Sequence, residues 1–111
     1  MHVMPTVIFK IVAETLWRSA ERRGVFTGSP DDERDGFIHF STAEQLGETA
    51  RKHFAGRRQL LLVTVDASQL ELRWEAARGG QLFPHLYGPL PMSAVRSVRE
   101  YDPESSASAP S

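Results

Sequence analysis

Residues 35–42 constrain the fold more than any other stretch, because they predict a short strand that turns directly into a helix. Their sequence is Asp-Gly-Phe-Ile-His-Phe-Ser-Thr. Side chains alternate along a strand, so Phe37 and His39 are predicted on one face and Ile38 and Phe40 on the other. The chain around this stretch must therefore supply partner strands and a surface for the following helix.

The end of this stretch carries a polar cluster at a predicted helix start. Ser41 or Thr42 can cap a helix over residues 43–54, since each is followed three positions later by Glu or Gln, as in a capping box. A histidine beside two hydroxyls at a helix N-terminus can hold an anion or a sugar hydroxyl. The alternative for His39 is structural, with its second ring nitrogen bound to a nearby backbone group.

The remaining pattern predicts one small α+β domain over residues 1–102, with a strongly bent or split, mainly antiparallel sheet of about five to seven strands and two helices. Leu60 to Val65 form a continuous apolar run that predicts a buried central strand. Residues 103–111, rich in Ser, Ala and Pro, are expected to be a disordered tail. The other expected elements are strands over residues 7–12, 70–76 and 94–102 and a helix over residues 13–23.

Two further segments are predicted to be irregular. Residues 27–35, with four acidic residues, are expected to form a polar loop that runs over the surface and could fold over a site. Residues 83–91 hold three prolines, which exclude a central strand in this interpretation. A stiff loop that carries His85 and Tyr87 is as typical of a site as of structural ring packing.

Charge and cysteine content narrow the partners and the chemistry. A formal net charge of −1 gives no reason to expect nucleic acid or an anionic membrane as partner. The chain has no cysteine, so disulfides, thiol catalysis and cysteine metal sites are excluded. Neither a signal peptide nor a membrane-spanning segment is predicted, and the default location is cytoplasmic.

The residues that can carry chemistry are few. The predicted catalytic residues are His39, Glu75 and His85, because His and Glu can exchange protons near neutral pH. Their side chains are expected to converge at one site. They could also bind a metal as two imidazoles and a carboxylate, but no His-x-x-x-His spacing supports this, and no metal is predicted. The predicted ligand-binding residues are Lys10, Ser41, Thr42, Arg73 and Tyr87.

The sequence also bears on the surroundings of Lys10, of Glu75 and of Ser41. Lys10, the only charge on its strand, is either a strand-end lysine that extends to water or a cation aimed into a cleft. Trp74 is predicted to point into the core and Glu75 to the opposite face, because neighbours on a strand alternate. Ser41 lacks the Gly-x-Ser-x-Gly elbow of a triad nucleophile, and no standard phosphate loop or Rossmann fingerprint is present.

Three segments together resemble the domain-of-unknown-function 952 family: Ile-Phe-Lys-Ile at residues 8–11, the stretch at residues 35–42, and residues 74–88, from Trp-Glu through Gly-Gly to Phe-Pro-His-Leu-Tyr-Gly. The resemblance covers roughly residues 6–101. It implies an ADP-ribosyltransferase-like fold, with a layout similar to the catalytic half of RNA 2′-phosphotransferases, which transfer a 2′-phosphate from an RNA splice junction to NAD. NAD or a related nucleotide is thus the candidate ligand, gripped by a split sheet.

The departures from the phosphotransferase pattern bear on activity. Those enzymes carry His-Gly-Thr where this chain has Lys-Ile-Val at residues 10–12, and they have an arginine-bearing N-terminal lobe for which this chain has no residues. Glu75 is the best match to the glutamate of many ADP-ribosyltransferases. Two hypotheses follow: an ADP-ribosyltransferase-like enzyme, in which His39, Ser41 and Thr42 bind ribose or phosphate and Glu75 orients the reacting centre, or a non-catalytic nucleotide-binding module.

Overall fold

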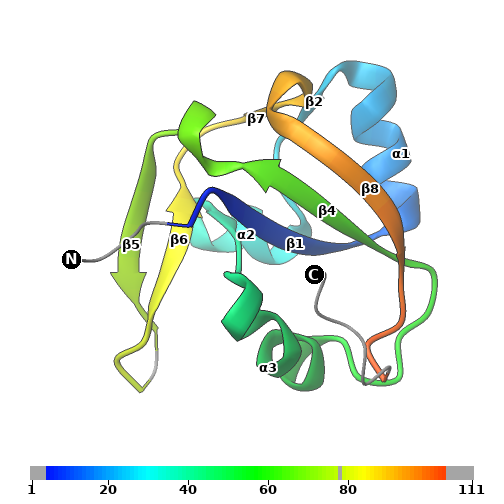
Figure 1. Cartoon of the computed structure of the whole chain (residues 1–111). Coiled ribbons are helices and arrows are strands. Elements are labelled where there is room, and N and C mark those ends of the chain that lie inside the picture. Colours follow the sequence, from blue (N-terminus) through cyan, green and yellow to red (C-terminus); the bar gives the residue numbers. More distant parts are fainter. Residues whose placement is uncertain (1–4, 78, 105–111) are drawn as a thin grey trace.

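The computed structural model describes residues 5–77 and 79–104, and the part of the predicted tail at residues 105–111 lies outside them. The predicted α+β class with mainly antiparallel strands is confirmed (Figure 1). The helices are α1 (Glu14–Arg23), α2 (Pro30–Asp35) and α3 (Ala43–His53). The strands are β1 (Val7–Ala13), β2 (Val25–Phe26), β3 (Ile38–His39), β4 (Leu60–Asp66), β5 (Leu72–Ala76), β6 (Leu82–Leu86), β7 (Leu90–Pro91) and β8 (Val95–Tyr101).

The first sheet is antiparallel, with the order β1-β4-β8. The predicted central strand is confirmed as β4, and its side chains serve two cores on opposite faces. Leu61, Val63 and Val65 belong to one hydrophobic cluster, while Leu60 and Leu62 belong to the other. Burial on both faces explains why the sequence of β4 is continuously apolar and does not alternate.

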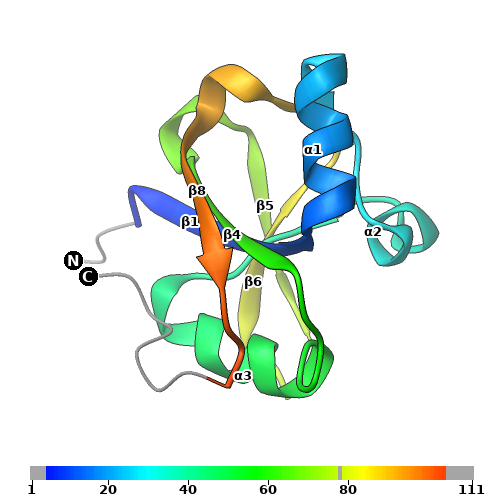
Figure 2. The same ribbon diagram turned by 90° about the vertical axis from the view of Figure 1, so that its right-hand side faces the viewer.

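The two longer helices close these two cores. Trp17 and Ala20 of α1 join the first cluster, and Leu46 and Ala50 of α3 join the second. Figure 2 shows α1 and α3 far apart, with strands of the sheets between them. The helices predicted over residues 13–23 and 43–54 are thus present, and each packs apolar residues into a core.

The sheet is split, as predicted, because a second three-stranded sheet has the order β3-β6-β5, and β2 pairs separately with β7. The β5–β6 hairpin stands beside the first sheet (Figure 1). Ile38 and Leu86 on one face of this second sheet join the first core. Its other face is thereby left to carry polar side chains.

Two of the sequence predictions about element number and type are wrong. The described residues contain three helices, because part of the predicted polar loop forms α2. Ser29 caps this helix in a capping box with Asp32, and Pro30 occupies its first turn. Gly36 ends it with φ of 88°, a conformation that glycine adopts at little cost. The strand count in the described part is eight, since three of the strands span only two residues.

The exclusion of a strand by the prolines of residues 83–91 is also wrong, because Pro84 lies in β6, the middle strand of the second sheet. Pro84 lies opposite Trp74 on β5, and its carbonyl accepts a hydrogen bond of 3.1 Å from the Phe40 backbone N–H. The strand β3 ends at His39, so the chain opposite Pro84 no longer belongs to that strand. No hydrogen bond between the two strands therefore needs the backbone N–H that Pro84 lacks.

Trp74 is less buried than the sequence predicted. It is half-buried, and neither hydrophobic cluster includes it, whereas Leu72 on the same strand packs against the first cluster. Trp74 lies nearer the turn of the β5–β6 hairpin, beyond the reach of the core. Among the described residues, no helix has the length and apolar content needed to cross a membrane.

Candidate functional site

The register of the second sheet gathers the predicted catalytic residues. His39 on β3 lies opposite His85 on β6, and His85 lies opposite Arg73 on β5. Residues directly opposite each other share a face, and so do residues two positions away, which adds Phe37 and Glu75. The structure thus brings His39, Glu75 and His85 together, and the ring centroids of the two histidines are 5.4 Å apart.

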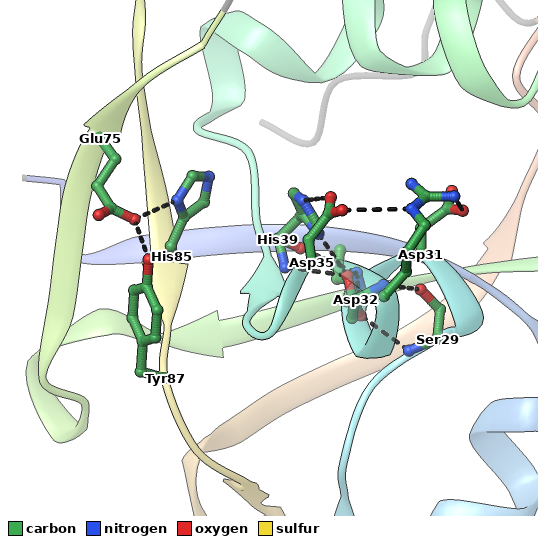
Figure 3. A network of polar contacts seen from close by, with 10 residues as sticks. Ser29, Asp31, Asp32, Asp35, His39, Glu75, His85 and Tyr87 are labelled. Carbon is green, nitrogen blue, oxygen red and sulfur yellow. Dashed lines mark hydrogen bonds and ion pairs between the residues drawn. The ribbon is translucent and has the colours of Figure 1, made fainter.

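The outer pair, Glu75 and His85, joins β5 to β6 (Figure 3). Nδ1 of His85 lies 2.7 Å from Oε1 of Glu75, and the Tyr87 hydroxyl donates to the same oxygen at 2.8 Å. The Glu75 side chain is 37% exposed, while that of His85 is 9% exposed. Arg73 covers one face of the Tyr87 ring, with 4.8 Å between the guanidinium carbon and the ring centroid. The carboxylate therefore faces solvent beside an aromatic surface.

The inner pair, Asp32 and His39, ties α2 to β3. Nδ1 of His39 lies 2.6 Å from Oδ1 of Asp32, and the backbone N–H of His39 donates to that oxygen at 3.1 Å. Oδ2 of Asp32 lies 3.0 Å from the Lys10 ammonium and accepts from the Ser29 backbone N–H at 2.8 Å. The Asp32 side chain is 2% exposed. The other ring nitrogen of His39, Nε2, lies 3.0 Å from Oδ2 of Asp35 near the surface (Figure 3).

Phe37 supplies the contact between the two pairs. Its ring stacks on His85 with 4.0 Å between centroids and 25° between planes. The same ring lies 4.6 Å from His39 and 5.1 Å from Tyr87. Aromatic contacts of this kind fix ring positions, and those of Phe37 hold the histidines in one arrangement.

The carboxylate of the inner pair is kept ionised against its burial. Burial alone raises the pKa of Asp32, but the hydrogen bond from His39 and the charge of Lys10 outweigh it, so this pKa lies well below the ordinary range. Burial lowers the pKa of Lys10, and Asp32 opposes that shift. The ion pair is therefore a fixed charged element inside the fold.

The carboxylate of the outer pair is ionised for a different reason. The hydrogen bond with His85 lowers the pKa of Glu75, and the Tyr87 hydroxyl lowers it further. The same contact raises the pKa of Tyr87. Glu75 is thus an exposed, ionised carboxylate at neutral pH.

Both interpretations of Lys10 from the sequence are wrong. It neither extends to water nor faces a cleft: it is 7% exposed, pairs with Asp32 and donates to the backbone carbonyl of His39 at 2.9 Å. The reason is that β1 directs Lys10 toward the first core, where α2 supplies a buried counter-charge.

Ser41 and Thr42 make their side-chain contacts with α3. The Ser41 hydroxyl lies 2.9 Å from that of Thr49, and the residue is buried. Thr42 is the N-cap of α3 and forms a capping box with Gln45, as the sequence predicted. These two hydroxyls serve the helix, whereas Arg73 and Tyr87 border the outer pair.

Sequence reasoning missed Asp32, Asp35 and Phe37 as parts of this arrangement. One signal was available: Ser29 followed three residues later by Asp32 is a capping signature, and the proline between them favours a helix start. That signal predicts α2 but not the partners of Asp32. Within the described residues, no group of three or more His, Cys, Asp or Glu residues is placed to hold a metal ion.

Comparisons with known proteins give a family and a fold. A family model described as "Protein of unknown function (DUF952)" matches residues 11–98. The crystal structure of protein CC0527 from Caulobacter crescentus is 45% identical, with 94% of this chain and 91% of that chain covered and a TM-score of 0.84. The solution NMR structure of CC0527 is 47% identical, with 88% and 86% covered and a TM-score of 0.79. No curated protein sequence matches this chain.

A more distant structure has the same fold. DarT from Thermus sp. 2.9, in complex with carba-NAD+, aligns with a TM-score of 0.57 over 91% of this chain and 85% of that chain. Its identity is 12%, so the likeness concerns the fold alone. The ADP-ribosyltransferase-like fold implied by the sequence is thereby confirmed.

Proposed function

This chain belongs to the DUF952 family, and we propose that its domain binds NAD or a related nucleotide at the face of the second sheet that carries the outer pair. One observation carries the proposal: an ionised, solvent-facing Glu75 lies within an aromatic cluster on a fold shared with a protein solved with an NAD analogue. Fold likeness alone would not assign a ligand, so the chemistry of these side chains has to fit.

The side chains fit a nucleoside with a charged, planar base. The exposed part of Tyr87 offers an aromatic surface on which a heteroaromatic ring can stack. An ionised carboxylate accepts hydrogen bonds from ribose hydroxyls, and the Glu75 side chain is 37% exposed. Arg73 is the cation beside this surface and can bind a phosphate group. These residues would hold the ligand.

The enzyme hypothesis adds ADP-ribosyl transfer to this binding. NAD supplies an ADP-ribosyl group and nicotinamide as the leaving group when an acceptor attacks the ribose carbon. Ionised Glu75 would orient the acceptor and balance positive charge at that carbon, because carboxylates stabilise developing positive charge. His85 would hold Glu75 in place through its ring N–H.

The second hypothesis is a non-catalytic nucleotide-binding module. It is favoured by Lys10, which occupies the position of the histidine in the first phosphotransferase motif. Its ammonium is buried in the pair with Asp32 and is not offered to a ligand. Ser41 and Thr42 are likewise engaged with α3.

Isothermal titration calorimetry of the whole chain with NAD, ADP-ribose and nicotinamide mononucleotide tests the proposal. Glu75→Gln should weaken binding roughly 10- to 100-fold, as expected when a hydrogen bond to a charged group is lost. Glu71→Gln, an exposed carboxylate just before β5, is the matched control and should bind as wild type does. Absence of binding by the wild type, or equal weakening by both variants, would contradict the proposal.

The two hypotheses separate in a second assay on the same samples. Incubation with NAD followed by chromatography detects free nicotinamide, which forms when water or another acceptor takes the ADP-ribosyl group. Release by wild type and not by Glu75→Gln would support the enzyme. Binding without release, with and without added protein or nucleic-acid acceptors, would support the module.

A further inference from the structure

We infer that Asp32, which neither the sequence motifs nor the proposed ligand contacts include, is a positioning residue that sets the tautomer of His39. It keeps the ring hydrogen on Nδ1, so that Nε2 is the nitrogen that His39 offers at the surface. The inference deepens the proposed function, on which its consequence for ligand binding rests. Its central observation, the tautomer, does not depend on any ligand.

The geometry fixes which atom donates. A carboxylate can only accept hydrogen bonds, so the 2.6 Å contact between Nδ1 and Oδ1 of Asp32 requires the hydrogen on Nδ1. The backbone N–H of His39 donates to the same oxygen, which locks the carboxylate against rotation from one side. The backbone N–H of Ser29 donates to the other oxygen, Oδ2. The two hydrogen bonds together fix the orientation of the Asp32 carboxylate.

A second carboxylate competes for the ring, and burial decides the outcome. Nε2 lies 3.0 Å from Oδ2 of Asp35, so a neutral ring can donate to only one of the two acids. Asp32 is nearer and 2% exposed, whereas Asp35 is 37% exposed and also contacts Arg34 at 3.3 Å. Electrostatic contacts weaken in water, so the buried partner prevails and the neutral ring carries its hydrogen on Nδ1.

The consequence is an acceptor at the surface. With its hydrogen on Nδ1, the neutral ring presents the lone pair of Nε2, which accepts from a ligand hydroxyl once the side chain of Asp35 turns away. In this tautomer Nε2 and Oδ2 of Asp35 are both acceptors, so no hydrogen bond holds the exposed Asp35 side chain beside the ring. Asp32 thus sets what His39 can bind without touching the ligand, in the manner of carboxylates that orient histidine in other sites.

The test is a pH titration of the 15N-labelled protein by two-dimensional NMR, which distinguishes Nδ1–H from Nε2–H in the neutral ring of His39. Asp32→Ala alone would leave the Lys10 ammonium buried without a partner and could unfold the chain. The informative variant is therefore Lys10→Met/Asp32→Ala, which removes both buried charges and is compared with the wild type. Asp35→Ala is the matched control at the other ring nitrogen.

The expected result is Nδ1–H in the wild type and in Asp35→Ala. In the Lys10→Met/Asp32→Ala variant the hydrogen should move to Nε2, because Asp35 becomes the remaining acceptor. A neutral wild-type ring with the hydrogen on Nε2, or a tautomer that does not change when Asp32 is removed, would overturn the inference. Neither outcome depends on whether the chain binds a nucleotide.

Ligand titrations of the same variants connect the tautomer to function. Nucleotide binding should weaken about tenfold in Lys10→Met/Asp32→Ala relative to the wild type, as for one lost hydrogen bond. In Asp35→Ala it should stay equal or become tighter. The predicted tautomers without nucleotide binding by the wild type would contradict the proposed function and leave the role of Asp32 intact. Nucleotide binding with the opposite tautomer would do the reverse.

Discussion

The inner and outer pairs are the same chemical unit in two environments. Each is a histidine Nδ1 on a carboxylate oxygen, at 2.6 Å for Asp32 and His39 and at 2.7 Å for Glu75 and His85. The inner carboxylate is 2% exposed and faces a buried ammonium, and the outer carboxylate is 37% exposed and faces a phenol. The distance between Nδ1 and the carboxylate oxygen therefore does not distinguish the two pairs, whereas their solvent exposure does.

The difference lies in what each carboxylate would lose if its partners changed. Inside the fold, Asp32 offsets the charge of Lys10, and removing either one leaves an uncompensated ion where water cannot reach it. At the surface, water can replace a lost partner of Glu75. The inner pair thus belongs to stability and positioning, while the outer pair is free to exchange its partners for a ligand.

Removing the inner carboxylate should produce the largest effect. We expect Asp32→Ala to lower the free energy of unfolding by about 3–5 kcal/mol, the range found when one partner of a buried ion pair is removed. Glu75→Gln should leave the urea midpoint close to that of the wild type. Unfolding can be followed by the fluorescence of Trp17, which is fully buried.

The control for this prediction removes both buried charges. Lys10→Met/Asp32→Ala leaves no unpaired ion and should recover much of the loss, because apolar replacements of buried ion pairs are often neutral. Equal urea midpoints for Asp32→Ala and Glu75→Gln would show that burial does not distinguish the two pairs, and the comparison would fail.

The second largest effect should be a loss of stability at acid pH that is caused by Asp32. The pKa of Asp32 is lowered in the folded chain, while an unfolded aspartate titrates near about 3.9. Below about pH 5 the unfolded chain therefore binds more protons, and stability falls as pH falls, by at most about 1.4 kcal/mol per pH unit for one group. Lys10→Met/Asp32→Ala should show a shallower loss in urea unfolding measured from about pH 7 to about pH 3. An unchanged slope would exclude Asp32 as its source.

Much of the architecture was predictable because it depends on local pattern. The buried strand β4, the helices α1 and α3, and the capping box at Thr42 were all predicted from the sequence and are present in the structure. The helix α2 was missed although Ser29 carries a capping signature. Its many acidic residues suggested a solvated loop, and one of them, Asp32, is instead buried against Lys10.

The site was predictable only in part because it depends on register. Residue types indicated His39, Glu75 and His85, but only the pairing of β3, β6 and β5 places them on one face. The link between Lys10 and Asp32 spans 22 positions and leaves no local signature. The depth of Trp74 likewise depends on where the hairpin extends beyond the core, which alternation along a strand does not reveal.

The smallest expected effect concerns the phenol of the outer pair. Tyr87→Phe removes one hydrogen bond to Glu75 and keeps the ring, so the pKa of Glu75 should rise toward its ordinary value. It should stay below that value, because the hydrogen bond with His85, the larger cause of the lowered pKa, remains. Carbon-13 NMR titration of the glutamate and aspartate carboxyl groups measures both pairs at once, with Glu75→Gln to assign the resonance. The carboxyl of Asp32 should titrate as in the wild type. A shifted Asp32 titration would show that the two pairs are coupled, and the stack of Phe37 on His85 would be the path to test first.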